Sequence, residues 1–147
     1  MKICFILTLV LFSSLLAQAQ TIKKTPALPL PSGAVKSTPA YAEILLRRTE
    51  RESELEELLL DYKEEYPKVK ELRFEIGSLQ KEMNKLTAVY AAASGKLTLA
   101  LGKLLVRKTE IETDLWNLRQ LYNDDHPEVK RARRKVEVYE RAIKEIL

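Results

Sequence analysis

Hydrophobic side chains recur at helical spacing through most of this chain. After Pro67 they step by three or four residues, at Val69, Leu72, Ile76, Leu79, Met83, Leu86 and Tyr90. After Pro127 the same spacing joins Val129, Ala132, Val136, Tyr139, Ile143 and Ile146. Such spacing keeps one apolar seam on one side of a helix, as in coiled coils. The pattern predicts an all-α fold.

The two seams belong to two copies of one unit. The stretch YKEEYPKVK at 62–70 returns as YNDDHPEVK at 122–130. When residues 41–87 are placed over 101–147 without a gap, 12 of the 47 positions are identical. Agreement of this length indicates an internal duplication.

Each proline stands where one helix should end and the next begin. Proline costs about 3 kcal/mol inside a helix but little in its first turn, and it disfavours helical backbone in the residue before it. We therefore expect helices near 41–63, 67–92, 97–123 and 127–147. The predicted corner residues are Tyr62, Tyr66, Pro67 and Val69 in the first copy and Tyr122, His126, Pro127 and Val129 in the second.

Two helical hairpins are thus predicted, at 41–93 and 94–147. A reversal at Ser94-Gly95 would give an antiparallel four-helix bundle with both corners at one end. Gly95 and Gly102 argue against the alternative, an elongated coiled coil in which 67–123 is one long helix with a corner at each end. In the closed bundle the acidic segment 50–65 would lie beside the basic segment 130–135 and neutralise it. The same pairing could instead join two copies of the chain.

One stretch lacks apolar side chains altogether. Residues 48–54 read RTERESE, seven polar residues in a row. We expect a solvated part of a long hairpin. The alternative is a polar layer that sets the register of the helices, or a face for a partner.

The first 40 residues have a different character. Residues 1–19 combine a positive start, an apolar run and the small residues Ala17 and Ala19, which is typical of a secretory signal peptide. We expect cleavage after Ala19 and a periplasmic or secreted protein without a transmembrane span, with retention as an anchor as the alternative. The chain's one cysteine, Cys4, would be removed. Residues 20–40 hold four of the six prolines and predict a disordered linker.

Composition and motifs do not favour an enzyme. The formal net charge is only +4, and the single histidine, His126, is matched by Tyr66 in the other copy. We find no catalytic, metal-binding or cofactor-binding motif. The candidate contact residues are Trp116, which an exposed position would mark as a partner site, and the basic cluster, which could meet a polyanion: Lys130, Arg131, Arg133, Arg134 and Lys135. Nucleic acid is not expected as the partner of an exported protein.

Both corner motifs resemble a known family. The pattern Tyr122-x-x-x-His126-Pro127-x-Val129, with Tyr66 replacing the histidine in the first copy, resembles the periplasmic coiled-coil hairpin of bacterial polysaccharide chain-length determinant and export proteins. The family's membrane helices and α/β base domain have no counterpart here. The resemblance implies a helical module in an envelope assembly. We expect a non-enzymatic, self-associating scaffold that binds copies of itself or another envelope protein. The alternatives are a holdase chaperone and a binder of anionic polysaccharide or lipid.

Overall fold

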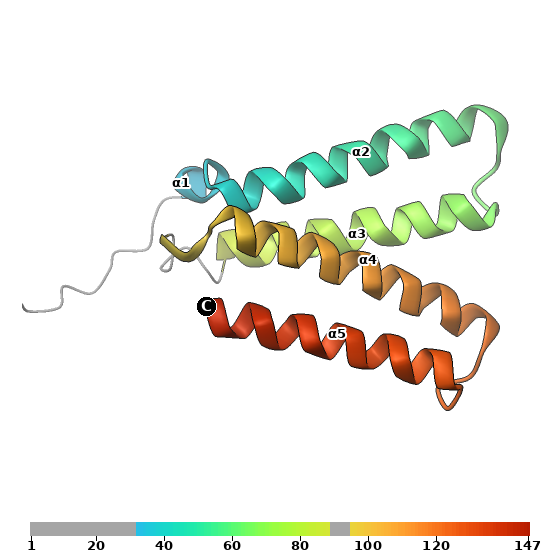
Figure 1. The fold of residues 1–147 in the computed structure, drawn as a ribbon. Coiled ribbons are helices and arrows are strands. Elements are labelled where there is room, and N and C mark those ends of the chain that lie inside the picture. The colour runs from blue at the N-terminus through green and yellow to red at the C-terminus, as the bar shows by residue number, and fades with distance from the viewer. Residues whose placement is uncertain (1–31, 89–94) are drawn as a thin grey trace, which may run out of the picture.

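The computed structural model describes residues 32–88 and 95–147, and the described chain is all-α (Figure 1). The predicted corners and the helices that flank them are confirmed, with ends shifted by a few residues. The helices are α1 (Ser32–Lys36), α2 (Pro39–Asp61), α3 (Pro67–Ala88), α4 (Leu99–Leu121) and α5 (Pro127–Ile146).

The predicted linker ends earlier than expected. Helix α1 and the first two residues of α2 fall within residues 20–40, and the side chains of Val35 and Ala40 are fully buried. Thr38 caps α2 by accepting a hydrogen bond from the Tyr41 amide at 3.4 Å. These apolar contacts order a stretch whose prolines favour extended chain. Residues 1–31, including the predicted signal peptide, lie outside the described residues.

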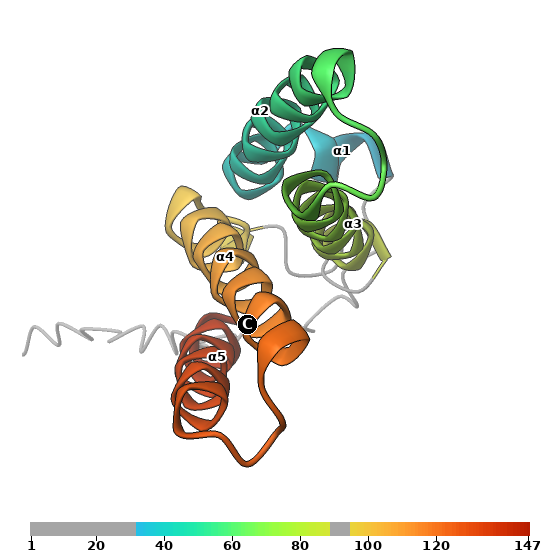
Figure 2. The same cartoon turned by 90° about the vertical axis from the view of Figure 1, so that its right-hand side faces the viewer.

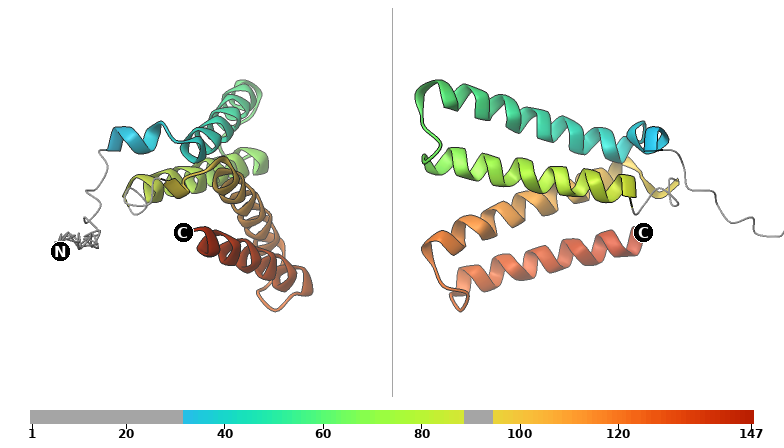
Figure 3. Two further views of the ribbon diagram at one scale, coloured as in Figure 1. Left: turned by 60° about the vertical axis from the view of Figure 1, so that its left-hand side comes forward. Right: turned by 180° about the vertical axis from the view of Figure 1, so that it is seen from behind.

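The two hairpins stand with both corners at the same end, as the bundle interpretation requires (Figures 1 and 3). The elongated form, with corners at opposite ends, is therefore wrong. The closed bundle is also wrong in one respect, since α2 and α5 lie on opposite sides of the molecule (Figure 2). Helix α4 lies between them and packs against α2, α3 and α5.

Gly102 explains how α4 reaches this central position. It lies inside α4, within the predicted helix 97–123, and not in a break between the hairpins. A Cβ atom at Gly102 would stand 2.8 Å from Cβ of Glu43 and 2.9 Å from Cα of Ala40. The missing side chain therefore lets α2 and α4 approach each other closely.

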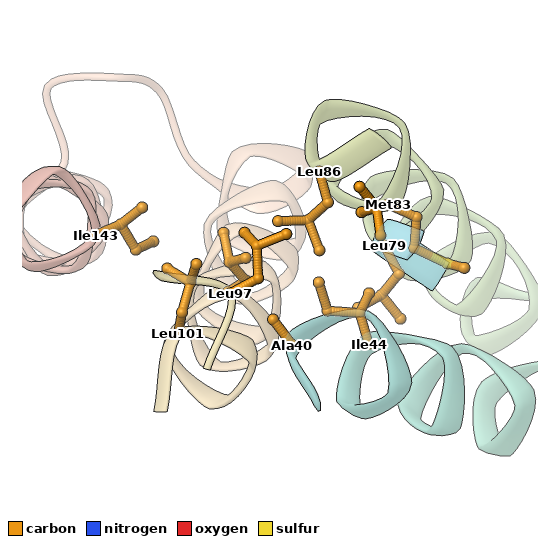
Figure 4. Packing of buried hydrophobic residues seen from close by; sticks show 10 residues of the cluster. Ala40, Ile44, Leu79, Met83, Leu86, Leu97, Leu101 and Ile143 are labelled. Carbon is orange, nitrogen blue, oxygen red and sulfur yellow. The ribbon is translucent and has the colours of Figure 1, made fainter. Parts of the chain in front are cut away.

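Apolar residues form two clusters along the hairpins. The larger lies at the end away from the corners and joins α1, α2, α3, α4 and α5 (Figure 4). The smaller fills the first hairpin near its corner, with Leu55, Val69 and Leu72 at its centre. Burying such side chains contributes about 1.5–3 kcal/mol each. The members of the larger cluster are Val35, Ala40, Ile44, Leu79, Met83, Leu86, Leu97, Leu101, Leu105 and Ile143.

A polar layer separates the two clusters. The Nη2 atom of Arg47 donates to Oε1 of Glu110 at 2.7 Å, and its Nε lies 3.3 Å from Oε1 of Glu75. Arg48 hydrogen-bonds Gln80 on α3. Arg47 borders the polar stretch 48–54, and Arg51 within the stretch lies 3.8 Å from Glu75 on α3. The stretch is therefore in part an inter-helix layer, and the expectation of a solvated stretch is wrong for its arginines. The reason is that α3 and α4 present carboxylates and an amide to this side of α2.

Candidate interaction surfaces

At the first corner a stacked pair of rings covers the turn. Tyr62 ends α2, and its ring lies parallel to that of Tyr66, with centroids 4.2 Å apart. Pro67 then begins α3, and Val69 is fully buried beneath the corner. The four predicted corner residues are thus brought together in one small structure.

The second corner repeats this arrangement with an imidazole. Tyr122 and His126 stack with centroids 4.0 Å apart, and Val129 is fully buried. His126 also caps α5, because its Nδ1 accepts a hydrogen bond from the Glu128 amide at 3.3 Å. His126 therefore stacks on a tyrosine and also caps a helix, whereas Tyr66 contributes a stacked ring to the first corner.

The corner end exposes large apolar side chains. Leu60 is 84% exposed and Leu121 is 75% exposed, one beside each corner. Tyr62 and Tyr122 are also exposed, at 45% and 43%. Exposed leucine and tyrosine side chains that gather at one end of a molecule are typical of a protein contact surface.

The basic cluster does not pair with α2. Lys130 pairs with Asp125, Arg131 with Glu128 and Arg133 with Asp124, each at 3.0 Å. These carboxylates come from the second corner and the first turn of α5. The predicted neutralisation by the acidic segment 50–65 of the same chain is therefore wrong, because α4 holds α5 away from α2. In the described residues no ion pair involves Arg134 or Lys135.

Trp116 faces α3 and is half-buried. Its ring stacks on Phe74, with centroids 5.1 Å apart and planes inclined by 17°. Both rings line a groove of about 340 Å³ between α3, α4 and α5. Arg131 and Lys135 line a different recess, so Trp116 and the basic cluster do not form one site.

Glu82 lines this groove, is almost fully buried and pairs with two lysines. Nζ of Lys108 donates to Oε1 of Glu82 at 2.8 Å, and Lys85 reaches the same oxygen at 2.8 Å. Burial opposes ionisation of Glu82, but these hydrogen bonds outweigh it and hold its carboxyl pKa below the ordinary value. Burial likewise opposes the charge on Lys108, yet Glu82 and Glu112 raise its pKa.

Glu75 shows the opposite balance. Desolvation on burial raises the pKa of its carboxyl, and the nearby charges of Arg51 and Arg47 do not fully compensate. Oε1 of Glu75 lies within ion-pair distance of both guanidinium groups without a hydrogen bond of good geometry. Such a carboxylate is costly to keep ionised.

Sequence reasoning missed two parts of these surfaces. Phe74 aligns with Arg134 in the duplication, and nothing in the sequence connects it to Trp116. The buried pair of Lys108 and Glu82 was hidden because both look like ordinary surface charges. A signal was available for Lys108, since Leu105 and Ile111 place it beside the buried face of its helix.

Neither a metal site nor a membrane span is found in residues 32–88 and 95–147. No group of three or more histidine, cysteine or acidic side chains there could hold an ion. No helix in those ranges has the length and apolar character to cross a bilayer. Comparisons with protein families, curated proteins and solved structures give no match to this chain.

Proposed function

We propose that this protein is an exported, non-enzymatic scaffold of the bacterial cell envelope, which associates with itself and binds protein partners at its corner end. The observation that carries the proposal is the paired display of Leu60 and Leu121 beside the two stacked corners. Exposing side chains of this size costs solvation free energy, which contact with a partner would recover. The character of residues 1–19 supports export, and the resemblance of both corners to envelope hairpins supports the compartment.

Rigid placement also supports a scaffold. Each corner is closed by a ring stack and anchored by a fully buried valine, so the exposed leucines stand on fixed helix ends. A contact surface held in this way loses little conformational entropy when a partner binds.

A second candidate is binding of an anionic polysaccharide or lipid headgroup by α5. It is favoured by Arg134 and Lys135, whose charges have no carboxylate partner in the described residues. This function predicts salt-sensitive binding that is lost when Arg131, Arg133 and Arg134 are changed to glutamine.

The scaffold proposal is tested in bacteria that express the full chain with a C-terminal affinity tag. Envelope cross-linking followed by purification should recover discrete protein adducts. The double variant Leu60→Glu/Leu121→Glu should lose those adducts, because it places two charges in the proposed contact.

The matched control is Leu99→Glu, a change of another exposed leucine at the opposite end of α4. It should leave the adducts unchanged, and circular dichroism should show the same helix content in all variants. Adducts that persist in the corner variant, or a chain retained in the cytoplasm, would contradict the proposal.

A further inference from the structure

The outer face of α2 carries a regular acidic stripe. On the side of α2 opposite its buried side chains, five residues are spaced alternately by four and three positions in the sequence. They therefore lie along one line of the helix. All five are exposed, and the two leucines at its ends are 57% and 84% exposed. The stripe consists of Leu46, Glu50, Ser53, Glu57 and Leu60.

The outer face of α5 carries a basic stripe with the complementary steps of three and four. It lies opposite Val129, Ala132 and Ile143, the residues buried against the rest of the molecule. Its members are all exposed, with Val138 at 51% in the middle. The stripe consists of Arg131, Arg134, Val138, Arg141 and Glu145.

Helices α2 and α5 lie on opposite sides of one molecule (Figures 1 and 2). Each stripe is on the side of its helix opposite the buried residues, so the two stripes cannot meet within one chain. Helix α2 ends at the corner end and α5 begins there. A second copy placed alongside in the same orientation would therefore bring its α2 antiparallel to α5 of the first. Glu57 and Glu50 are seven residues apart, as are Arg134 and Arg141, so each pair spans about 10 Å and the opposite charges match.

Within one chain these exposed charges have almost no ion-pair partners. No ion pair in the described residues involves Glu57, Arg134 or Arg141, whereas Glu50 has only Arg47, on its own helix, at 3.4 Å. Antiparallel contact between the stripes would give each of these charges an oppositely charged partner.

We infer that copies of this chain associate side by side, with the acidic stripe of one on the basic stripe of the next. The inference rests on the self-association in the proposed function and names its interface. Because the two faces differ and lie on opposite sides, the contact is heterologous, and each copy added leaves a new free face. Assemblies should therefore grow beyond two copies as concentration rises.

The test is sedimentation velocity on the purified exported chain at low and high ionic strength. The wild-type chain should form species larger than two copies at low salt and dissociate at high salt. Glu57→Arg alone, or Arg134→Glu alone, should weaken association by about tenfold or more, because each sets like charges against each other.

Rescue distinguishes this contact from any other. An equimolar mixture of the two single variants should recover association, since each then offers the charge that the other requires at both faces. The chain with both changes should recover it as well. Lys103→Glu, the same charge change at an exposed lysine on α4, should have no effect.

Three results would overturn the inference: a wild-type chain that stays monomeric at low salt, assembly that stops at two copies, or no recovery in the mixture. Leu60 belongs to the acidic stripe but Leu121 lies outside both stripes, so the single variant Leu121→Glu in the cross-linking experiment tests the corner end separately. The corner-end proposal can therefore stand where this one fails. Heparin binding lost in Arg134→Glu without any association of copies would support the polyanion function instead and also overturn the inference.

Discussion

At the scale of single residues, Gly102 sets the distance between α2 and α4. Its hydrogen faces Ala40 and Glu43, where a Cβ would fall 2.8 Å from one carbon and 2.9 Å from another. We predict that Gly102→Ala lowers the free energy of unfolding by about 1–3 kcal/mol, because backbone on α2 must move to admit the methyl group. Urea denaturation followed by circular dichroism measures this loss.

Gly77 provides the matched control. It also lies inside a helix, but a Cβ there would meet no atom within 4 Å. Gly77→Ala should raise stability by about 0.5–1 kcal/mol, since alanine loses less backbone entropy than glycine on forming a helix. Equal effects of the same sign at the two glycines would show that the close approach of α2 and α4 is not what Gly102 provides.

At the scale of helices, α4 is held on several sides and α5 mainly on one. Seven residues of α4 are buried, including Leu101, Leu105 and Ile111, whereas α5 buries only Val129, Ala132 and Ile143. We predict that amides of α5 exchange with deuterium faster than those of α4, because α5 can detach while the other helices remain packed. Hydrogen exchange with mass spectrometry, at high salt to keep copies apart, tests this order.

A shortened side chain at Ile143 should make the amides of α5 exchange with deuterium faster still. Ile143→Ala weakens the contact of α5 with the larger apolar cluster, to which Ile146 also contributes, and should speed exchange in α5 far more than in α3. If both helices lost protection equally, α5 would be part of a single cooperative unit.

The helices and corners could be predicted from sequence because local chemistry determines them. Pro67 and Pro127 fix where helices begin, and the three-four spacing fixes which faces are buried. The placement of α5 could not be predicted, because opposite charges on α2 and α5 fit contact within one chain and contact between chains equally well. The sequence could not decide between a solvated stretch and a polar layer, because only the fold reveals that Glu75 and Glu110 face Arg47.

At the scale of the whole molecule, two buried carboxyls on α3 should give stability opposite responses to pH. Glu75 and Glu82 are only 5% and 4% exposed, but the pKa of Glu75 is raised and that of Glu82 is lowered. The lowered pKa means that Glu82 contributes stability above its unfolded pKa, near 4.5, and that this contribution is lost as the pH falls further. The raised pKa means that the folded state takes up a proton at Glu75 first, so the cost of its charge disappears as the pH falls towards 4.5.

Replacing each carboxyl by an amide separates the two responses. At pH 7, Glu82→Gln should lose about 3 kcal/mol, because Lys108 keeps its buried charge with only Glu112 nearby at 3.2 Å. Glu75→Gln should change stability by about 1 kcal/mol or less, since Arg47 and Arg51 keep Glu110 and Glu54 as partners.

Urea denaturation from pH 7 to pH 3.5 should show that the stability deficit of Glu82→Gln relative to wild type becomes smaller at the acid end. Over the same fall in pH, the free energy of unfolding of the wild-type chain should rise relative to that of Glu75→Gln. Parallel curves for the two variants would mean that the surroundings of Glu75 and Glu82 do not act on the two carboxyls in opposite directions, and that Lys108 and Lys85 do not hold Glu82 in its charged form.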